Sequence, residues 1–535
     1  MTVRYYISFI IISVLCMTSS SLHSEDKVPI RLFIQMSSEE QASNTGLSEY
    51  IEAYNQSQDR IELILDITTA GCSFDAADTL LDRIAAGRSP DITLLRYCEL
   101  WDHYLDLKPY LNNCDLSDVD TTLFSRFRYN GKQIYYPTSY GTDLFFYNKD
   151  LFDSAGVAYP PHQYNTPYAD GDPWDMQKLE EIAMLLTLDR AGRNANDPEF
   201  NATQIEQYGF HWVWNNGIGF IQAFGPPSIV DGEGNVSIPR CMREGYHWSH
   251  EGIWEKHFIP SDYVFDYEMD NNPIGSGKCA MVLTGAYYAD DLDSTINWDI
   301  AAVPSYNGVH NISWGIGGLA ILNNTKYPDE AFEILMMIAN TFEYYAGGLL
   351  VPTNLSFRQA LPVTWTDAFP GVDTQVFLDG LDHLSPVSDA EVVRYKMGAW
   401  RYLNEFRDYL RNNSNADIEG GINSWLIPNL EPFFQTSHSD FRSPSNVPGQ
   451  YGLFQNYPNP FNPVTTICYQ LPRSGHASLK IYDINGRVVN TLVNQNQSAG
   501  HHEVMFDGSE LASGVYVCQL RSGEFMDKRK LMLMK

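Results

Sequence analysis

The chain has 535 residues, which is length enough for about three or four domain-sized units. Apolar residues make up 44% and charged residues 19%, an ordinary globular composition that excludes a disordered chain and a coiled coil. With 35 basic against 66 acidic residues the net charge is −31, and such a surface repels both nucleic acid and anionic membranes.

The N-terminus has the order of a secretory signal peptide. Arg4 supplies a positive charge, Tyr5 to Met17 is apolar, and Thr18 to Ser24 is small and polar. The apolar run is too short to span a bilayer comfortably, and no later stretch reaches about 18 apolar residues. A lipid-anchored alternative is disfavoured because no small residue precedes Cys16. We therefore predict a signal peptide over residues 1–24 and an exported protein.

From residue 28 onward, strand and helix patterns alternate along the chain. The first five elements are a strand, a helix, a strand, a helix and a short buried strand, over residues 28–35, 47–56, 60–70, 76–87 and 90–95. Later patterns predict strands at 279–285 and 298–304, and amphipathic helices at 326–340 and 391–413. Strands separated by helical stretches of about 10–15 residues predict parallel pairing in a doubly wound α/β sheet. A region of about 400 residues is too long for one core, so we expect two lobes.

The composition changes near residue 436. Residues 436–450 are rich in Ser and Pro, which is typical of a linker. Beyond them, ICYQL, ASLKIYDI, HEVMF and VYVCQL alternate apolar and polar residues between turn signals, which predicts a small all-β, Ig-like sandwich over 451–535. This segment has a net charge of +2 against −33 for the first 450 residues, which supports separate domains. Cys468 and Cys518 lie in two of its strands, where they either bridge locally or stay as buried thiols.

Five segments of the large region occur in the order and spacing of a known family. They are GKQIYYPTSYGTDLFFYNKDLFDSAGV (131–157), QYGFHW (207–212), GSGKCAMVLTGAYYADDL (275–292), WDIAAVP (298–304) and WGIGGLAILNNTKYPDEAFEILMMIA (314–339). Together they resemble the extracellular solute-binding proteins of the sugar-binding class, the receptor components of ATP-driven importers, over nearly all of residues 28–430.

That resemblance implies the organisation of a solute-binding domain over residues 25–435. The fold would be α/β, of the two-lobe type II periplasmic-binding-protein class. Lobe 1 would hold about 28–140 and 300–345, and lobe 2 about 144–299 and 346–435. Crossing strands would join the lobes, and the ligand would bind in the cleft between them.

A cleft of this kind needs aromatic faces for stacking and polar groups for the buried hydroxyls of a sugar, and it opens beyond the carboxyl ends of the strands. An aromatic content of 13%, with 33 tyrosines and 11 tryptophans, suits such stacking. The candidate ligand-binding residues follow predicted strands or lie on crossing strands. They are Met36, Ser37, Glu39, Arg96, Tyr97, Tyr140, Asp143, Trp212, Trp214, Tyr287, Trp314, Gly315 and Arg358.

Several candidates have a structural alternative. Asp143 either accepts hydrogen bonds from two sugar hydroxyls or makes a capping or hinge hydrogen bond. Trp212 and Trp214 either stack on the ligand or pack in the core, and Arg358 has the alternative of a surface ion pair. Tyr287 occupies the position of a cleft aromatic in the family that the chain resembles, so we expect it to line the cleft.

Motifs for metals, cofactors and catalysis are missing from the sequence. It contains no C-x-x-C pair and no H-E-x-x-H, G-x-S-x-G or Walker A motif. The loop Asp189–Asp197 lies where many relatives carry an acidic, calcium-like loop, but Arg190 and Arg193 interrupt it. The pair Asp290–Asp291 would suit a glycosidase, yet nothing in the sequence sets two carboxylates across a cleft. We expect no catalytic residue, no cofactor and no bound metal.

The C-terminal segment carries a second resemblance. YPNPFNPVTTICYQLP (457–472), LKIYDINGRVVNTLV, AGHHEVMFDGSELASGVYVCQL and DKRKLMLMK are similar to the type A sorting domains of the type IX secretion system. The family implies an address that the outer-membrane machinery reads. In the same segment Asn485–Gly486 predicts a hairpin turn with positive φ. A plain Ig-like adhesive module is the alternative.

The two resemblances lead to one hypothesis. We expect an exported receptor, monomeric and free of cofactors, that closes two lobes around a sugar or oligosaccharide at the cell surface or outside the cell. It would remain periplasmic if the C-terminal domain were not a working signal. Expected partners are the type IX secretion machinery and a transporter permease, and nucleic acid is not one of them. The alternatives are a glycan-degrading enzyme on the same scaffold and a receptor for a peptide or a polyamine.

Overall fold

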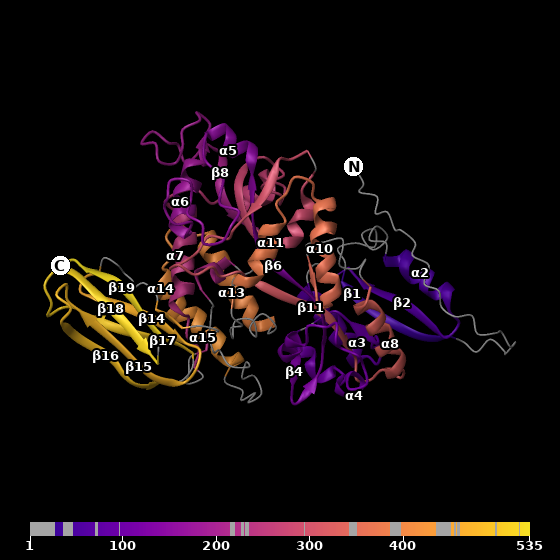
Figure 1. Ribbon diagram of the computed structural model, residues 1–535. Coiled ribbons are helices and arrows are strands. Elements are labelled where there is room, and N and C mark those ends of the chain that lie inside the picture. The colour runs from indigo at the N-terminus through magenta and orange to yellow at the C-terminus, as the bar shows by residue number, and fades with distance from the viewer. Residues whose placement is uncertain are drawn as a thin grey trace.

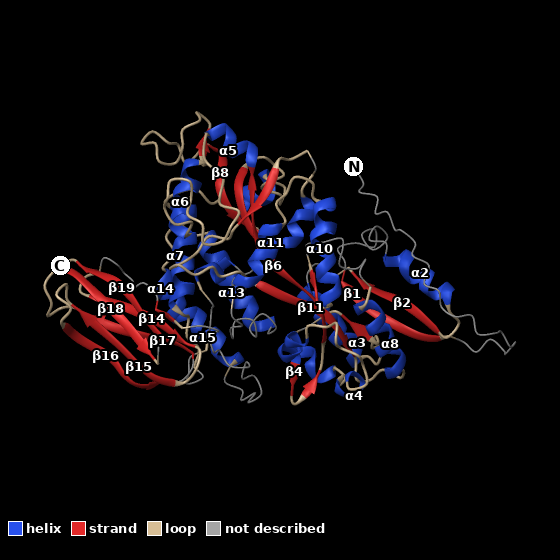
Figure 2. Ribbon diagram, viewed as in Figure 1, coloured by secondary structure: helices blue, strands red, loops and turns tan. Residues whose placement is uncertain are grey.

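The computed structural model describes residues 27–35, 47–69, 73–95, 97–213, 220–225, 229–230, 235–293, 295–341, 350–385, 397–434, 451–453, 456, 461–497, 500–523 and 525–535. The predicted signal peptide at 1–24 and the linker at 436–450 lie outside the described residues. The chain forms a large mixed α/β region followed by a C-terminal region of strands (Figures 1 and 2).

The chain begins with the parallel strand–helix alternation that the sequence predicts. β1 (Val28–Gln35) pairs in parallel with β2 (Ile61–Thr68) and with β3 (Ile92–Thr93). The helices of this layer are α2 (Leu47–Ser57), α3 (Ser73–Ala85) and α8 (Pro328–Ala339). One apolar face of α8 enters the same buried cluster as β1; it consists of Ala331, Ile334, Leu335 and Ile338.

The long strand β6 (Tyr136–Asn148) runs through the middle of the α/β region (Figure 1). Its first half pairs with β11 (Trp314–Ile321) and β12 (Val351–Pro352). Its second half pairs with β9 (Cys279–Gly285) and β10 (Trp298–Ala301). The result is one ten-stranded sheet in the order β2-β1-β3-β11-β6-β9-β8-β7, to which β10 and β12 add at β6.

The second lobe is built around β9 and β8 (Ile205–Trp212), which run parallel. Helices and short strands complete the α/β region: α4 (Lys108–Leu111), β4 (Arg128–Tyr129), β5 (Lys132–Gln133), α5 (Lys149–Ala155), α6 (Met176–Leu185), β7 (Leu188–Asp189), α7 (Arg240–Trp254), α10 (Leu355–Ala368), α11 (Gln375–Gly380), α13 (Met397–Arg411), α14 (Ile418–Gly421) and α15 (Ile427–Leu430).

Three buried clusters divide the interior of the α/β region. One holds α8 with β1 and β2, and another holds α6, α7, α13 and the second half of β6. The third contains residues from both ends of the sheet, among them Phe33, Tyr140 and Val282. This middle cluster lies where the two lobes meet, so the predicted two-lobe α/β class is confirmed.

The C-terminal strands form two facing sheets with a core of their own. One sheet contains β13 (Gly452–Leu453), β14 (Val464–Leu471) and β17 (Gly500–Asp507); the other contains β16 (Val488–Gln497), β15 (Gly475–Tyr482), β18 (Gly514–Ser522) and β19 (Phe525–Leu533). The predicted hairpin turn is present, with a φ of 77° at Gly486.

The local disulfide considered for this domain is not formed. Cys518 is a buried free thiol on β18, while Cys468 lies on β14 in the opposite sheet. Burial raises the pKa of the Cys518 thiol to about 12, so it stays protonated and unreactive at neutral pH. Within the described residues, no helix has both the length and the apolar character that crossing a membrane requires.

β8 and α6 pack so closely that one added methyl group should destabilise the protein. A Cβ added to Gly209 would lie 1.9 Å from the carbonyl oxygen of Ala183 in α6. Gly209→Ala should therefore lower the free energy of unfolding by about 2 kcal/mol or more, measured by urea denaturation. Gly475→Ala is the matched control, because nothing lies within 4 Å of the added Cβ. Equal stability of the two variants would contradict this packing.

Candidate functional site

The strand β6 changes partners in the middle of the sheet. Thr142 pairs with Trp314 on β11, whereas the next residue, Asp143, pairs with Gly285 at the end of β9. The backbone N–H of Asp143 also donates to the carbonyl of Ser313, with an N···O distance of 2.8 Å. The change of partners therefore brings β6, β11 and the end of β9 together at one point between the lobes.

Aromatic rings gather at this point. Tyr140 and Trp314 are buried and make an edge-to-face contact with 5.7 Å between ring centroids. The indole N–H of Trp314 donates to the carbonyl of Ser385 at 2.9 Å, which fixes the ring. Tyr287 differs from both because it is 49% exposed. Its ring lies against Gly285, where an added Cβ would come within 2.2 Å of it.

Arg358 on α10 packs against the Tyr140 ring. Its guanidinium lies 5.3 Å from the Tyr140 ring centroid, donates to the Pro352 carbonyl at 2.7 Å and pairs with Asp120 at 2.9 Å. Burial raises the pKa of Tyr140, and the Arg358 charge opposes that rise. Burial also acts against ionisation of Asp120, yet hydrogen bonds from Thr122 and Arg358 lower its pKa below the usual value. These contacts favour the ion-pair alternative for Arg358, with a partner that the sequence did not indicate.

Glycines allow the crossing strands to approach closely. Gly315 pairs with Gly141 across β11 and β6, and further along β11 a Cβ on Gly318 would lie 2.2 Å from the Tyr136 carbonyl oxygen of β6. The position of Gly315 is therefore consistent with a role in strand crossing. Its backbone is also partly exposed, so contact with a ligand is compatible with the same position.

The remaining candidates fall into two groups. Tyr97 is buried in the middle cluster, and Trp212 is buried against Phe210 and Trp248, with ring centroids 4.8 and 5.6 Å away. The contacts of Trp212 favour core packing over ligand stacking. The others lie outside the described residues: Met36, Ser37, Glu39, Arg96 and Trp214.

Two adjacent carboxylates follow Tyr287 on the helical turn Ala286–Asp291. Loss of hydration to the surrounding chain, together with the charge of Asp291, raises the pKa of Asp290 to about 6. Burial also raises the pKa of Asp291. Ionisation of both groups therefore lowers the free energy of unfolding.

The loop at Asp189 is held by hydrogen bonds and an arginine. One Asp189 oxygen accepts the backbone N–H groups of Ala191 and Arg193, and the other accepts from the Arg193 side chain and the Asn201 backbone, at 2.8 to 3.0 Å. Burial acts against ionisation, but these donors lower the pKa of Asp189 below its usual value. The Arg193 guanidinium thus supplies the positive charge at this carboxylate. In the described part of the chain, no three or more His, Cys, Asp or Glu side chains are grouped as metal ligands.

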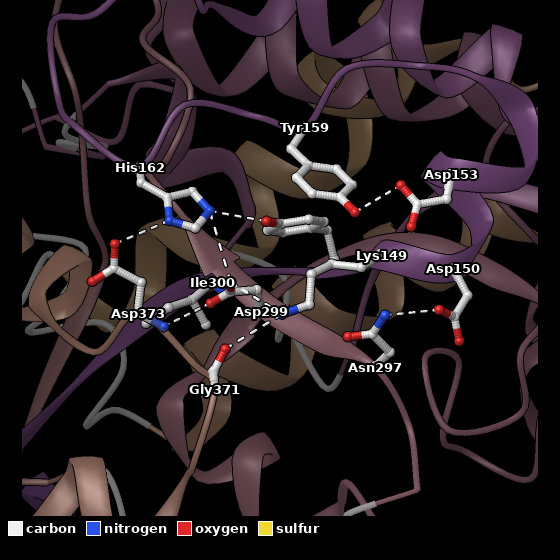
Figure 3. Close-up of polar contacts among 11 residues, drawn as sticks. Lys149, Asp150, Asp153, Tyr159, His162, Asn297, Asp299, Ile300, Gly371 and Asp373 are labelled. Carbon is white, nitrogen blue, oxygen red and sulfur yellow. Dashed lines mark hydrogen bonds and ion pairs between the residues drawn. The ribbon is translucent and has the colours of Figure 1, made fainter.

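A polar network surrounds the far end of β6 (Figure 3). His162 bonds the Tyr147 hydroxyl at 2.9 Å through one ring nitrogen and Asp373 at 3.0 Å through the other. Lys149 bonds Asp299 at 3.4 Å and the carbonyl of Gly371 at 3.3 Å. The network contains a Tyr–His–Asp series. The hydroxyl of this series belongs to Tyr147, which is fully buried and whose pKa is raised by burial. The network joins the loop after α10 to β6 and β10.

Two family profiles match the chain. The profile of the bacterial extracellular solute-binding proteins matches residues 41–340, more than half of the chain, and that of the secretion system C-terminal sorting domain matches residues 455–534. No curated protein matches the chain in sequence.

Solved structures share the fold of the α/β region. The substrate-binding protein Lmo0181 of Listeria monocytogenes, in complex with cycloalternan, is 20% identical with a TM-score of 0.59. MalE3 of T. maritima with bound maltose is 17% identical with a TM-score of 0.57. Each alignment covers 76% of this chain and 99% of the other. The maltotriose-bound MalE domain of Bdellovibrio bacteriovorus is 16% identical, with a TM-score of 0.55, and 76% of this chain covers all of it.

These matches confirm both resemblances seen in the sequence. The two profiles together indicate an exported protein of the cell surface. The chain belongs to the family of bacterial extracellular solute-binding proteins and carries a secretion system C-terminal sorting domain at its end.

Proposed function

We propose that this protein is a receptor that closes its two lobes around a neutral sugar or oligosaccharide without transforming it. The observation that carries the proposal is the exposed Tyr287 ring, which lies against Gly285, the residue that pairs with Asp143 where β6 changes partners. Aromatic faces beside polar groups suit the alternating C–H and hydroxyl faces of a pyranose. The similar structures with bound cycloalternan, maltose and maltotriose support the same ligand class.

The geometry suggests how such a receptor would act. A hinge at the partner change of β6 would let the lobes close over a ligand and remove it from water. Tyr287 would stack on the sugar ring, and the Asp143 carboxylate would accept hydroxyl hydrogen bonds. Met36, Ser37, Glu39, Arg96 and Trp214 follow predicted strands and remain proposed contacts.

The proposal includes two kinds of protein partner. The sorting domain at 455–534 would be read by the type IX secretion machinery, and a permease or an outer-membrane uptake system would accept the ligand. The sorting domain has a compact core separate from that of the α/β region, which supports its role as an independent address.

An enzyme on the same scaffold is the rival function. Asp290 and Asp291 are the carboxylates with raised pKa values, but they are adjacent on one short helical turn. A glycosidase needs its two carboxylates on opposite sides of the scissile bond, about 5 to 9.5 Å apart. The raised pKa of Asp290 follows from partial loss of hydration and from its neighbour's charge, so it requires no catalytic role.

The ligand class is tested by thermal unfolding of the full chain against mono- and oligosaccharides. A ligand that binds the folded state at about 100 times its Kd should stabilise the α/β region by roughly 2.7 kcal/mol. Tyr287→Ala should reduce this gain by removing the exposed stacking face, and Trp314→Ala should reduce it by loosening the hinge aromatics. Tyr159→Ala is the control, because this tyrosine is 39% exposed but contacts Tyr147 at the other end of β6.

Two results would contradict the proposal. Stabilisation by peptides or polyamines, with none by any sugar, would assign the cleft to another class of ligand. Release of shortened products from the same glycans, lost in Asp290→Asn, would establish the enzyme.

The raised pKa of Asp290 predicts a pH-dependent gain of stability in Asp290→Asn. Its folded-state pKa of about 6 exceeds the unfolded value of about 3.9, so the wild type loses stability as the pH rises through 6. Asparagine does not ionise, and the variant should be more stable by about 1 kcal/mol at pH 7, after allowance for solvent screening. The difference should vanish below about pH 4.

Urea unfolding at pH 3.5, 5 and 7 measures this difference. Asp59→Asn, an exposed aspartate in the other lobe, provides the control for removal of one charge from an acidic protein. A gain that stays constant between pH 3.5 and 7 would show that ionisation of Asp290 is not its cause.

A further inference from the structure

A hollow on the second lobe is not explained by the hinge site. It lies between α13 and the segment that runs from Asp417 through α14 to Trp425, and its volume is about 490 Å³. The inner faces of these helices pack with α7, whereas Tyr140 and Trp314 of the hinge belong to a different buried cluster. The volume falls within the range of about 300–1,000 Å³ that is typical of small-ligand sites.

Three aromatic rings line the hollow. Phe406 is buried, while Tyr409 is 39% and Trp425 is 36% exposed. The ring planes of Tyr409 and Trp425 lie within 33° of that of Phe406, at centroid distances of 6.0 and 6.3 Å. Trp425 lies on the π-helical turn Ile422–Leu426, a form of helix that often occurs at functional sites. The hollow thus offers flat, partly solvated ring faces of similar orientation.

Two glycines allow the walls of the hollow to pack closely. A Cβ on Gly421 would lie 2.8 Å from the Phe406 ring, so a larger residue would force the helix away from it. A Cβ on Gly420 would lie 2.0 Å from an Asp417 carboxylate oxygen, so glycine leaves room for that carboxylate at the rim. The two glycines thus allow the Phe406 ring and the Asp417 carboxylate to occupy the wall of the hollow.

Carboxylates stand at the rim with unused acceptor capacity. Glu405 makes no hydrogen bond or ion pair with any described residue. Asp417 accepts one hydrogen bond, from the Gly420 backbone at 2.9 Å through Oδ1, and its other oxygen has no partner in the described parts of the chain. Both groups accept hydrogen bonds, and their charge repels anions.

We propose that this hollow is a second carbohydrate site, which holds a neutral pyranose unit of a glycan by stacking on Trp425 and Tyr409 and by hydroxyl hydrogen bonds to Glu405 and Asp417. Flat apolar faces beside free acceptors complement a sugar ring, whose C–H groups cover one face and whose hydroxyls project from its edge. The two carboxylates select neutral over acidic sugars. The site stands independently of the hinge site, and it would hold the protein on a polymer while the cleft remains available.

Affinity electrophoresis of the full chain in gels that contain soluble glycogen, galactomannan, xylan or polygalacturonate tests the proposal. The wild type should be retarded by at least one neutral polymer and not by polygalacturonate. Trp425→Ala should lose the retardation, and Glu405→Gln should weaken it while leaving the fold intact. Ser424→Arg gives a second blocking variant. Ser424 is an exposed residue that lines the hollow, so the longer arginine side chain should obstruct the opening while every core side chain is kept. Tyr159→Ala should migrate like the wild type.

The hinge variant Trp314→Ala separates the two sites. It should keep the retardation while its sugar-induced thermal shift is reduced, whereas Trp425→Ala should lose the retardation and keep the thermal shift. Retardation lost in Trp314→Ala and kept in Trp425→Ala and Ser424→Arg would assign glycan binding to the cleft and overturn the second site. A wild type that no neutral polymer retards would also overturn it, whatever the cleft binds.

Discussion

The pairing of β6 with two sets of strands is the interaction on which the rest of the α/β region depends. Both edges of its first half are occupied, by β11 and β12, and both edges of its second half are occupied, by β9 and β10. Because buried backbone groups must remain hydrogen-bonded, each half of β6 moves with its own neighbours. The hinge that we propose therefore lies between Thr142 and Asp143, at the candidate site.

The aromatic residues near the hinge divide between support and contact. Tyr140 and Trp314 are held in place, one beneath the Arg358–Asp120 ion pair and the other by its bond to Ser385. Tyr287 reaches solvent, as a ligand-stacking group must. Side chains that are already fixed before binding reduce the conformational entropy that binding removes.

The acidic residues differ in their effect on stability, because their surroundings differ. At Asp189 a buried carboxylate is compensated by Arg193 and backbone donors, so its pKa falls. At Asp290 loss of hydration and the charge of Asp291 act without an opposing donor among the described residues, and the pKa rises. At Glu405 and Asp417 the charges remain at a solvated rim, where their acceptor oxygens are open to a neutral ligand. The same residue type therefore supports the fold, opposes it or serves a proposed site, according to the donors around it.

The sequence by itself determined the two-domain organisation and the order of most elements. Local periodicity and turn chemistry depend on near neighbours, so the strand at 279–285, the apolar face of α8 and the Asn485–Gly486 turn could all be predicted. The resemblance to solute-binding proteins also located the crossing segment near Tyr140.

The tertiary structure decided which side chains are available for binding. The packing of Trp212 against Trp248, the Asp120 partner of Arg358 and the free thiol of Cys518 each depend on residues or strands distant in the chain. The hollow beside Trp425 likewise forms only when α13 packs against the segment from Asp417 to Trp425. Exposure and pairing are set by such long-range contacts, and no local pattern in the sequence encodes them.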